Sequence, residues 1–182
     1  LVTADTLVVA GTATVTITGN PSISDLNAIA ARTSGVVTTT LAADSLSNLG
    51  ALNTAGTDAI TITVNDAAEA DVTATDLSTL GGKTAGTVTV SNAVDIAGTA
   101  SELTAALVTD STKVVASTAT ATISDAAETD IAATVLSAIG AKTSGAVTAT
   151  NAIDIAGTAS ELTAALVTDD TKVVASTATA TI

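Results

Sequence analysis

The stretch that decides the fold runs from Asn65 to Ile123 and reads NDAAEADVTATDLSTLGGKTAGTVTVSNAVDIAGTASELTAALVTDSTKVVASTATATI. A second copy follows it without a gap, from Ser124 to Ile182, and is identical to it at 45 of 59 positions. Six of the 14 differences exchange Val with Ile or Thr with Ala. Self-similarity at a fixed period is typical of proteins in which each unit packs on its neighbours. The sequence therefore predicts an array of stacked units.

A shorter and more diverged copy precedes these two units. Residues 25–29 (DLNAI), followed by 33–35 (TSG), match 76–80 (DLSTL) followed by 84–86 (TAG) at an offset of 51. We expect all copies to belong to one continuous structure. The chain then divides into diverged, shorter repeats over residues 1–64, one 59-residue unit over 65–123 and another over 124–182.

Threonine alternates with aliphatic residues in seven short segments along the chain. Such alternation of β-branched residues at period 2 indicates half-buried strands. The centres of neighbouring segments lie 22 to 31 residues apart, which is too far for hairpins and suits crossovers between parallel strands. The central threonines are Thr16, Thr38, Thr61, Thr89, Thr120, Thr148 and Thr179.

Helix start signals lie between these segments. Residues 99–102 and 158–161 (TASE in both) have the spacing of a capping box. Asp66 and Asp125 offer acidic starts for two further helices, because a carboxylate is favourable at the positive end of the helix dipole. Strand, short helix and parallel strand in repetition predict an α/β fold, specifically a right-handed parallel β/α solenoid. A parallel β-helix is the alternative.

The composition excludes most of the side-chain types that proteins use for catalysis, metal binding and disulfide formation. The chain of 182 residues carries 5 basic and 18 acidic residues, a net charge of −13, which argues against nucleic acid as a partner. It contains no Cys, His, Met, Phe, Tyr or Trp, so thiolate and imidazole metal sites, disulfides and Ser-His-Asp catalysis are excluded. No run of 18 apolar residues occurs, so membrane insertion is not expected. We expect no enzymatic activity and no cofactor.

The alternating threonines are the first candidate for a functional surface. If the aliphatic residues of each strand face the helices, the seven central threonines face solvent and form a ladder of hydroxyls. Regular Thr-x-Thr rows on parallel sheets resemble the binding faces of β-solenoid antifreeze proteins. The resemblance implies a ligand face for ice or polysaccharide. The alternative is that Thr serves as a soluble strand former whose hydroxyls bond along the ladder.

Recurring aspartates are the second candidate. Carboxylate and carbonyl oxygens are the ligands that calcium prefers, but no EF-hand loop or glycine-rich nonapeptide occurs in the chain. Capping and solubility are the alternative roles for these residues. Lys83 with Lys142, and Lys113 with Lys172, also recur at the period and are interpreted as rows that neutralise stacked carboxylates. The calcium candidates are Asp95, Asp110, Asp154 and Asp169, with Asp170 beside the last.

The aromatic-free repeats rich in Thr, Ala and Asp resemble the tandem-repeat regions of large bacterial extracellular proteins, namely surface adhesins and S-layer-like or filament proteins. The resemblance implies a structural or adhesive module outside the cell or on its surface. Its expected partners are copies of itself, further repeats of the same protein, or cell-surface polysaccharide. Open strand edges near residues 8–18 and 177–182 are the expected contact points for stacking end to end.

Overall fold

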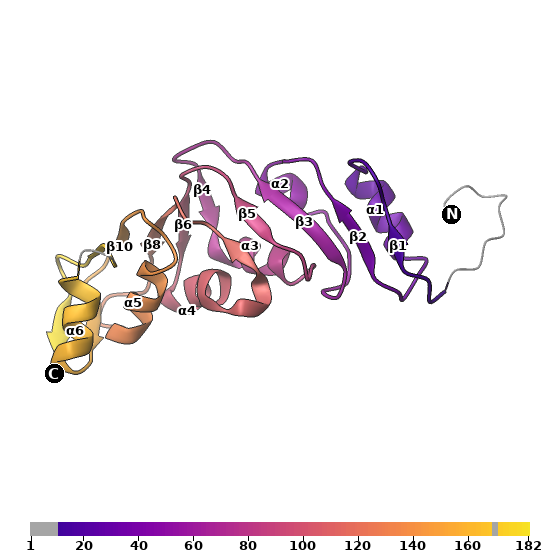
Figure 1. The fold of residues 1–182 in the computed structure, drawn as a ribbon. Helices are drawn as coiled ribbons and strands as arrows, with labels where there is room; N and C mark the ends of the chain where they lie inside the picture. The colour runs from indigo at the N-terminus through magenta and orange to yellow at the C-terminus, as the bar shows by residue number, and fades with distance from the viewer. Residues whose placement is uncertain (1–10, 169–170) are drawn as a thin grey trace.

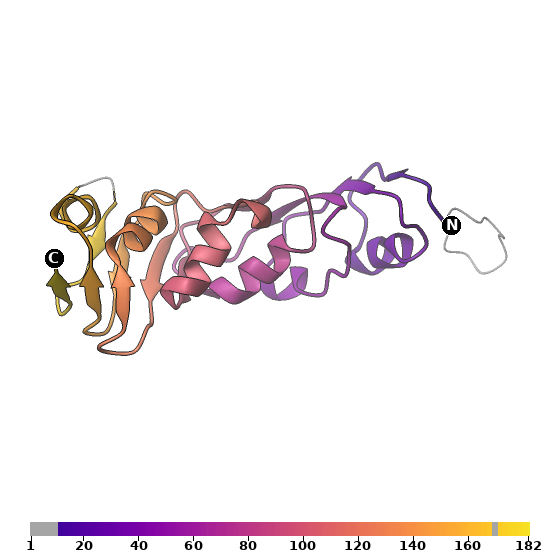
Figure 2. The same cartoon turned by 90° about the horizontal axis from the view of Figure 1, so that it is seen from below.

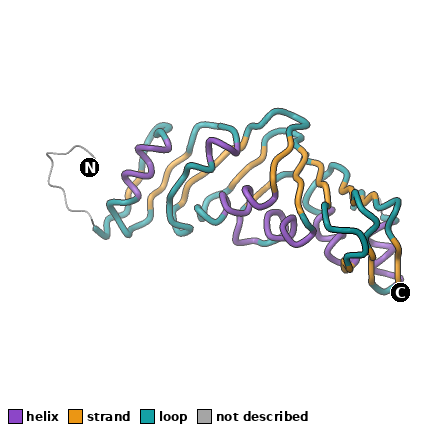
Figure 3. Tube along the Cα trace, turned by 180° about the vertical axis from the view of Figure 1, so that it is seen from behind, coloured by secondary structure: helices purple, strands orange, loops and turns teal. Residues whose placement is uncertain are grey.

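The computed structural model describes residues 11–168 and 171–182. Over these residues the protein is an α/β structure of parallel sheets and short helices, which confirms the α/β class predicted from the sequence. The molecule is elongated, and its first described residues and its C-terminus lie at opposite ends (Figures 1 and 2). The strands follow one another along its length, with helices beside them (Figure 3).

The described strands form three sheets in which every adjacent pair is parallel. The first sheet has the order β1 (Val15–Thr16), β2 (Val37–Thr40), β3 (Ala59–Val64), β5 (Val88–Val90) and β7 (Val114–Val115). The second has the order β4 (Asp71–Thr73), β6 (Asp95–Gly98), β8 (Thr120–Ile123), β10 (Val147–Ala149) and β12 (Val173–Val174). The third has the order β9 (Asp130–Ala132), β11 (Asp154–Ala156) and β13 (Thr179–Thr181).

Strand β8 links the two 59-residue units. On one edge it pairs with β6 of its own unit, with Ala121 beside Ile96. On the other edge it pairs with β10 of the next unit, with Ala121 beside Val147. The last strand of one unit is therefore also the strand on which the next unit builds.

Short helices connect the strands, and most of them begin at a side-chain cap. Five of the six α-helices in the described residues carry a Ser or Thr N-cap whose hydroxyl accepts from the N–H of the third helical residue, whereas the helix that begins at Ala133 has no side-chain cap. The capping boxes predicted at Thr99 and Thr158 are both formed. The helices are α1 (Ile23–Ala30), α2 (Leu46–Leu49), α3 (Ala74–Gly81), α4 (Ala100–Leu103), α5 (Ala133–Gly140) and α6 (Ala159–Leu166).

The prediction that helices begin at Asp66 and Asp125 is wrong. The helices begin eight residues later, at Ala74 and Ala133, after the short strands β4 and β9, which the sequence analysis also missed together with β6 and β11. The physical reason is a turn at Glu69 and Glu128, whose φ angles of 64° and 62° are left-handed and incompatible with a continuing α-helix.

The core is a thin aliphatic layer between the sheets and the helices. On β3 the side chains of Ile60, Ile62 and Val64 are fully buried, and threonines alternate with them on the other face. Leu77 and Leu80 of α3 are buried as well. A layer this thin is filled by Ala, Val, Ile and Leu, which accounts for the missing aromatic residues.

At three places a Thr-x-Gly segment joins neighbouring coils, where a coil means one strand together with the chain that leads to the next parallel strand of its sheet. Thr84 is 2% exposed, and its hydroxyl donates to the Ile60 carbonyl at 2.7 Å and accepts from the Gly86 N–H at 2.8 Å and the Ile60 N–H at 2.9 Å. A Cβ on Gly86 would clash with the Ile60 carbonyl. Residues 33–35 and 143–145 make the corresponding contacts to the Ala13 and Ala119 carbonyls.

We expect Thr84→Val to destabilise the fold by about 1–3 kcal/mol, because buried backbone groups lose their hydroxyl partner while the side-chain volume is kept. The control is Thr87→Val, at an exposed position of the same segment, for which little change is expected. Urea unfolding followed by far-UV circular dichroism measures both, since the chain has no aromatic fluorophore. Equal midpoints for the two variants would contradict the role given to Thr84.

Candidate functional site

The seven predicted threonines all lie outside the core, but they do not form one ladder. Thr16, Thr38, Thr61 and Thr89 belong to the first sheet, Thr120 and Thr148 to the second, and Thr179 to the third. Thr16 and Thr38 are the one pair among the seven that lie directly opposite each other. The other threonine pairs in register are Thr40 with Thr61, Thr63 with Thr89, and Thr122 with Thr148.

On the second and third sheets, aspartates take the place of some threonines at the same register position. Asp71, Asp95 and Thr120 occupy one register position on β4, β6 and β8. The hydroxyl of Thr120 donates to Asp95 Oδ1 at 3.0 Å, and that of Thr122 donates to Asp95 Oδ2 at 2.9 Å. The third sheet repeats this arrangement 59 residues later, with the hydroxyl of Thr179 donating to Asp154.

These contacts bear on the predicted calcium sites. Asp95 and Asp154 lie on strands β6 and β11 and accept hydrogen bonds from threonine hydroxyls. Asp110 begins a short 3₁₀ turn after α4 and is exposed, while Asp169 and Asp170 lie outside the described residues. Within residues 11–168 and 171–182, no three Asp or Glu side chains are grouped so that they would hold a metal ion.

Three other aspartates have a role that the sequence analysis missed. Asp66 Oδ2 accepts from the Leu46 N–H at the start of α2 at 2.7 Å. Asp125 Oδ2 accepts from the Ala100 N–H at the start of α4 at 2.6 Å. Each carboxylate thus caps a helix of the preceding coil instead of a helix of its own. The recurrence of Asp66 and Asp125 at the period was the available signal for this role.

Asp58 is 4% exposed and also joins two coils. Its Oδ1 accepts from the Val37 N–H of β2 at 2.8 Å, and its Oδ2 accepts from the Ala55 N–H at 2.9 Å. The residue 59 positions later is Ser117, so the repeat gave no signal for this contact. Because both carboxylate oxygens already bond backbone donors, Asp58 is placed for structure and not for acid-base chemistry.

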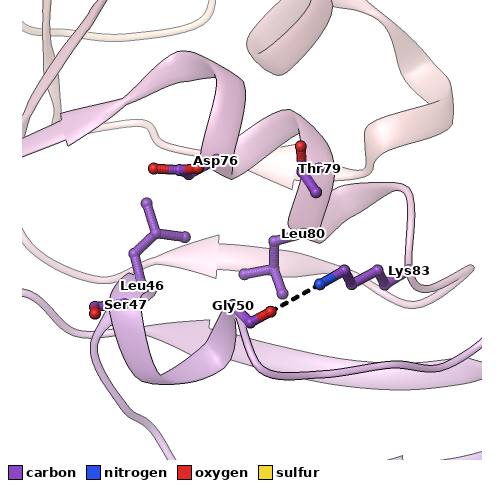
Figure 4. A pocket seen from close by; sticks show the side chains of 7 residues that line it. All are labelled: Leu46, Ser47, Gly50, Asp76, Thr79, Leu80 and Lys83. Carbon is purple, nitrogen blue, oxygen red and sulfur yellow. Dashed lines mark hydrogen bonds between the residues drawn. The ribbon is translucent and has the colours of Figure 1, made fainter.

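A hollow of about 270 Å³ lies between α2 and α3 (Figure 4). Of the two helices, α2 has four residues and α3 has eight. Lys83 crosses it and donates to the Gly50 carbonyl at 2.8 Å, and Asp76 accepts from the Thr73 hydroxyl at 2.7 Å. The next unit has Val135 where this one has Asp76. The charged groups that line the hollow are therefore already hydrogen-bonded, and the next repeat unit does not keep both of them.

A second kind of hollow does recur at the period. It lies beside the short edge strands β7 and β12, with volumes of about 340 and 440 Å³. Lys113 lines the first and Lys172 the second, and both have left-handed φ angles of 53° and 47°. Val115 and Val174 lie exposed in the same places. Both hollows are thus lined by a lysine and by aliphatic side chains, and Asp110 and Lys142 also line the first.

Comparison with protein-family models, with curated proteins and with solved structures gives no match to this chain. None of the helices in the described part of the chain is long and apolar enough to cross a membrane.

The two capping boxes make the stability of the fold depend on pH. Hydrogen bonds from the Thr99 backbone N–H, then from the hydroxyls of Thr99 and Thr75, hold the pKa of Glu102 below its usual 4.5. The Thr158 N–H and hydroxyl likewise lower the pKa of Glu161. A lowered folded-state pKa contributes stability that is present above the unfolded-state value and is lost as the pH falls through the folded value.

We therefore expect the melting temperature to fall as the pH drops below about 4.5, and to fall less steeply in the double variant Glu102→Gln with Glu161→Gln. Glutamine keeps the capping geometry but does not titrate. The control is Glu69→Gln with Glu128→Gln, which removes two carboxylates from exposed positions outside the helices. Equally steep acid losses in both double variants would show that the capping boxes do not carry the effect.

Proposed function

We propose that this chain is a non-enzymatic structural or adhesive repeat module of a long extracellular rod or filament, built as a parallel β/α solenoid. The observation that carries the proposal is that contacts recur at the period. Asp71 beside Asp95 becomes Asp130 beside Asp154, and Val88 beside Val114 becomes Val147 beside Val173. Such a structure has equivalent positions along its length. It therefore suits a role in spacing or presenting other groups better than catalysis at a single site.

The link between units supports an extended shape. Because β8 serves the sheets of two successive units, a further unit adds strands to an existing sheet without forming a separate domain. The acidic surface supports the same role, since a net charge of −13 keeps neighbouring rods apart in solution. The extracellular location rests on the resemblance of the repeats to those of bacterial surface proteins.

Appending further copies of residues 124–182 to the C-terminus tests this role. We expect each copy to raise the maximum dimension in small-angle X-ray scattering by the same increment, with unchanged ellipticity per residue, because each unit repeats one step. The control appends a unit with Val at the positions of Gly140 and Gly145, where a Cβ would clash with the Thr171 and Ala119 carbonyls. A normal appended unit that leaves the maximum dimension unchanged would refute the rod.

A ligand face for ice or polysaccharide is the second candidate. It is favoured by the exposed pair Thr16 and Thr38, which lie in register on the first sheet. It ranks second because the hydroxyls of Thr120, Thr122 and Thr179 are bonded to carboxylates on the other sheets.

If the first sheet binds ice or glycan, Thr38→Lys should abolish thermal hysteresis or glycan-array binding without changing the melting temperature, because Thr38 is exposed. The matched control is Thr118→Lys, at an exposed position beside the second sheet. Absence of both activities in the unmodified chain at high concentration would remove this candidate.

A further inference from the structure

We propose that the free edge of β9 binds an extended basic peptide, which adds to the third sheet as a further strand. This inference goes beyond the structural role proposed above and does not depend on it. The site lies between α4 and α5, away from both ends of the molecule (Figure 1). Every residue that lines it is described, whereas the edge expected at residues 8–18 lies partly outside the described residues. We call this site, formed by β9, the start of α4 and Val135, the β9 groove.

β9 has a free edge because the third sheet begins inside the chain. β9 pairs with β11 on one side only, and the strand before it in the chain, β8, belongs to the second sheet. The Thr129 carbonyl accepts from the Asp154 N–H at 2.9 Å, on the edge that faces β11. Backbone groups of successive residues in a strand point to opposite edges, so those of Ile131 also face β11. The N–H and C=O of Asp130 and the N–H of Ala132 therefore face the free edge, with which no described strand pairs.

The β9 groove contains a hollow of about 350 Å³ that adjoins the free edge. All three residues of β9 line it, together with Asp125 and Val135. The remaining lining residues are Ala100, Ser101 and Thr104, from α4 and the turn that follows it. The volume lies at the lower end of the range for ligand pockets, so the groove has room for a few residues of an extended peptide beside the strand edge.

The preceding unit builds the equivalent place differently. At the end of β4 the Thr73 hydroxyl accepts from the Asp76 N–H at 3.1 Å and donates to the Asp76 carboxylate at 2.7 Å. Ala132 and Val135 stand at these two positions in the next unit, so α5 begins without a side-chain cap. The second unit thus lacks a stabilising cap at the place where its groove has aliphatic walls. Departures from local stability rules are expected at functional sites, which favours a binding role for the β9 groove.

The residues of β9 determine the sequence pattern of the peptide. Ile131 is buried, while Asp130 and Ala132 on either side of it are exposed. Neighbouring strands of a sheet share their faces, and side chains at the same register position are in contact. The added strand therefore needs an aliphatic side chain beside Ile131 and a polar one beside Asp130. We expect a peptide in which aliphatic and polar residues alternate.

The carboxylates of the groove determine the charge of the peptide. Asp125 lines the groove, and Asp130 is exposed on the strand edge itself. Asp130 also lies beside Asp154 of β11 in register, and like charges directly opposite each other on adjacent strands repel. A Lys or Arg side chain next to Asp130 would offset this repulsion, whereas an acidic side chain would add to it. The polar positions of the peptide are therefore basic.

Titration of the whole chain with the hexapeptide TKVKVT, followed by amide shifts in proton–nitrogen NMR spectra, tests the proposal. We expect saturable shifts that centre on Asp130, Ala132 and the other residues of the β9 groove. Binding should weaken as salt is added, because the paired charges are exposed. The control peptide TEVEVT keeps the alternation but carries the opposite charge, and should not bind. Shifts spread over the acidic surface, or equal binding of both peptides, would overturn the proposal.

The variant Ala132→Pro tests the role of the strand edge. Ala132 has a φ angle of −66°, which suits proline, and Ile131 before it is extended, as the residue before a proline must be. The substitution removes the N–H that faces the free edge and leaves the bonds to β11 in place. We expect an unchanged melting temperature and loss of peptide binding. The matched control Ala132→Ser keeps the N–H and should bind like the unmodified chain. Equal binding by both variants would contradict binding at the edge.

Charge reversal separates the β9 groove from the general acidity of the chain. We expect Asp130→Lys to weaken TKVKVT binding several-fold, and Asp71→Lys, at the equivalent position of β4, to leave it nearly unchanged. Equal weakening by the two variants would show that the peptide responds to net charge alone, and the proposal would fall. Self-association in sedimentation velocity that Ala132→Pro removes would assign the free edge to a second copy and would likewise overturn it. The rod is tested separately by the appended units and does not fall with the groove.

Discussion

The close approach of successive coils is the constraint on which the rest of this structure depends. At Gly35, Gly86 and Gly145 the backbone passes so near the preceding strand that a Cβ would clash with its carbonyl groups. A threonine two residues earlier supplies the hydroxyl that bonds the same strand. Coils held this close leave a thin layer, and only small aliphatic side chains fill a thin layer without strain. The absence of aromatic residues is thus a consequence of coil spacing.

The same spacing determines what the charged residues do. Asp58, Asp66 and Asp125 each reach from one coil to backbone N–H groups of the preceding coil, so part of the negative charge holds coils together. Asp95 and Asp154 stand beside like charges on adjacent strands and accept bonds from threonine hydroxyls, which offsets a repulsive arrangement. Carboxylates that looked like cation ligands in the sequence are therefore used in contacts between coils.

Much of the fold could be predicted from the sequence. Period-2 threonine segments predicted strands, and TASE predicted both capping boxes. The strands β4, β6, β9 and β11 could not be predicted, because three or four residues with one buried side chain give no periodic signal. The candidate surface was predicted only in part, since the outward face of the threonines follows from alternation but their distribution over three sheets depends on register.

By itself the sequence determined the period, the α/β class and the choice of small residues, since these follow from local patterns that repeat. Only the tertiary structure decided where two segments of identical sequence adopt different structures. ASELTAALV occurs twice; at residues 100–108 it forms a short α-helix followed by a π-helical turn, and at 159–166 it continues as one α-helix. TATATI also occurs twice, with its last Ile buried at 123 and exposed at 182. The physical reason is that burial and helix geometry depend on the coil packed on top, which a local pattern does not specify.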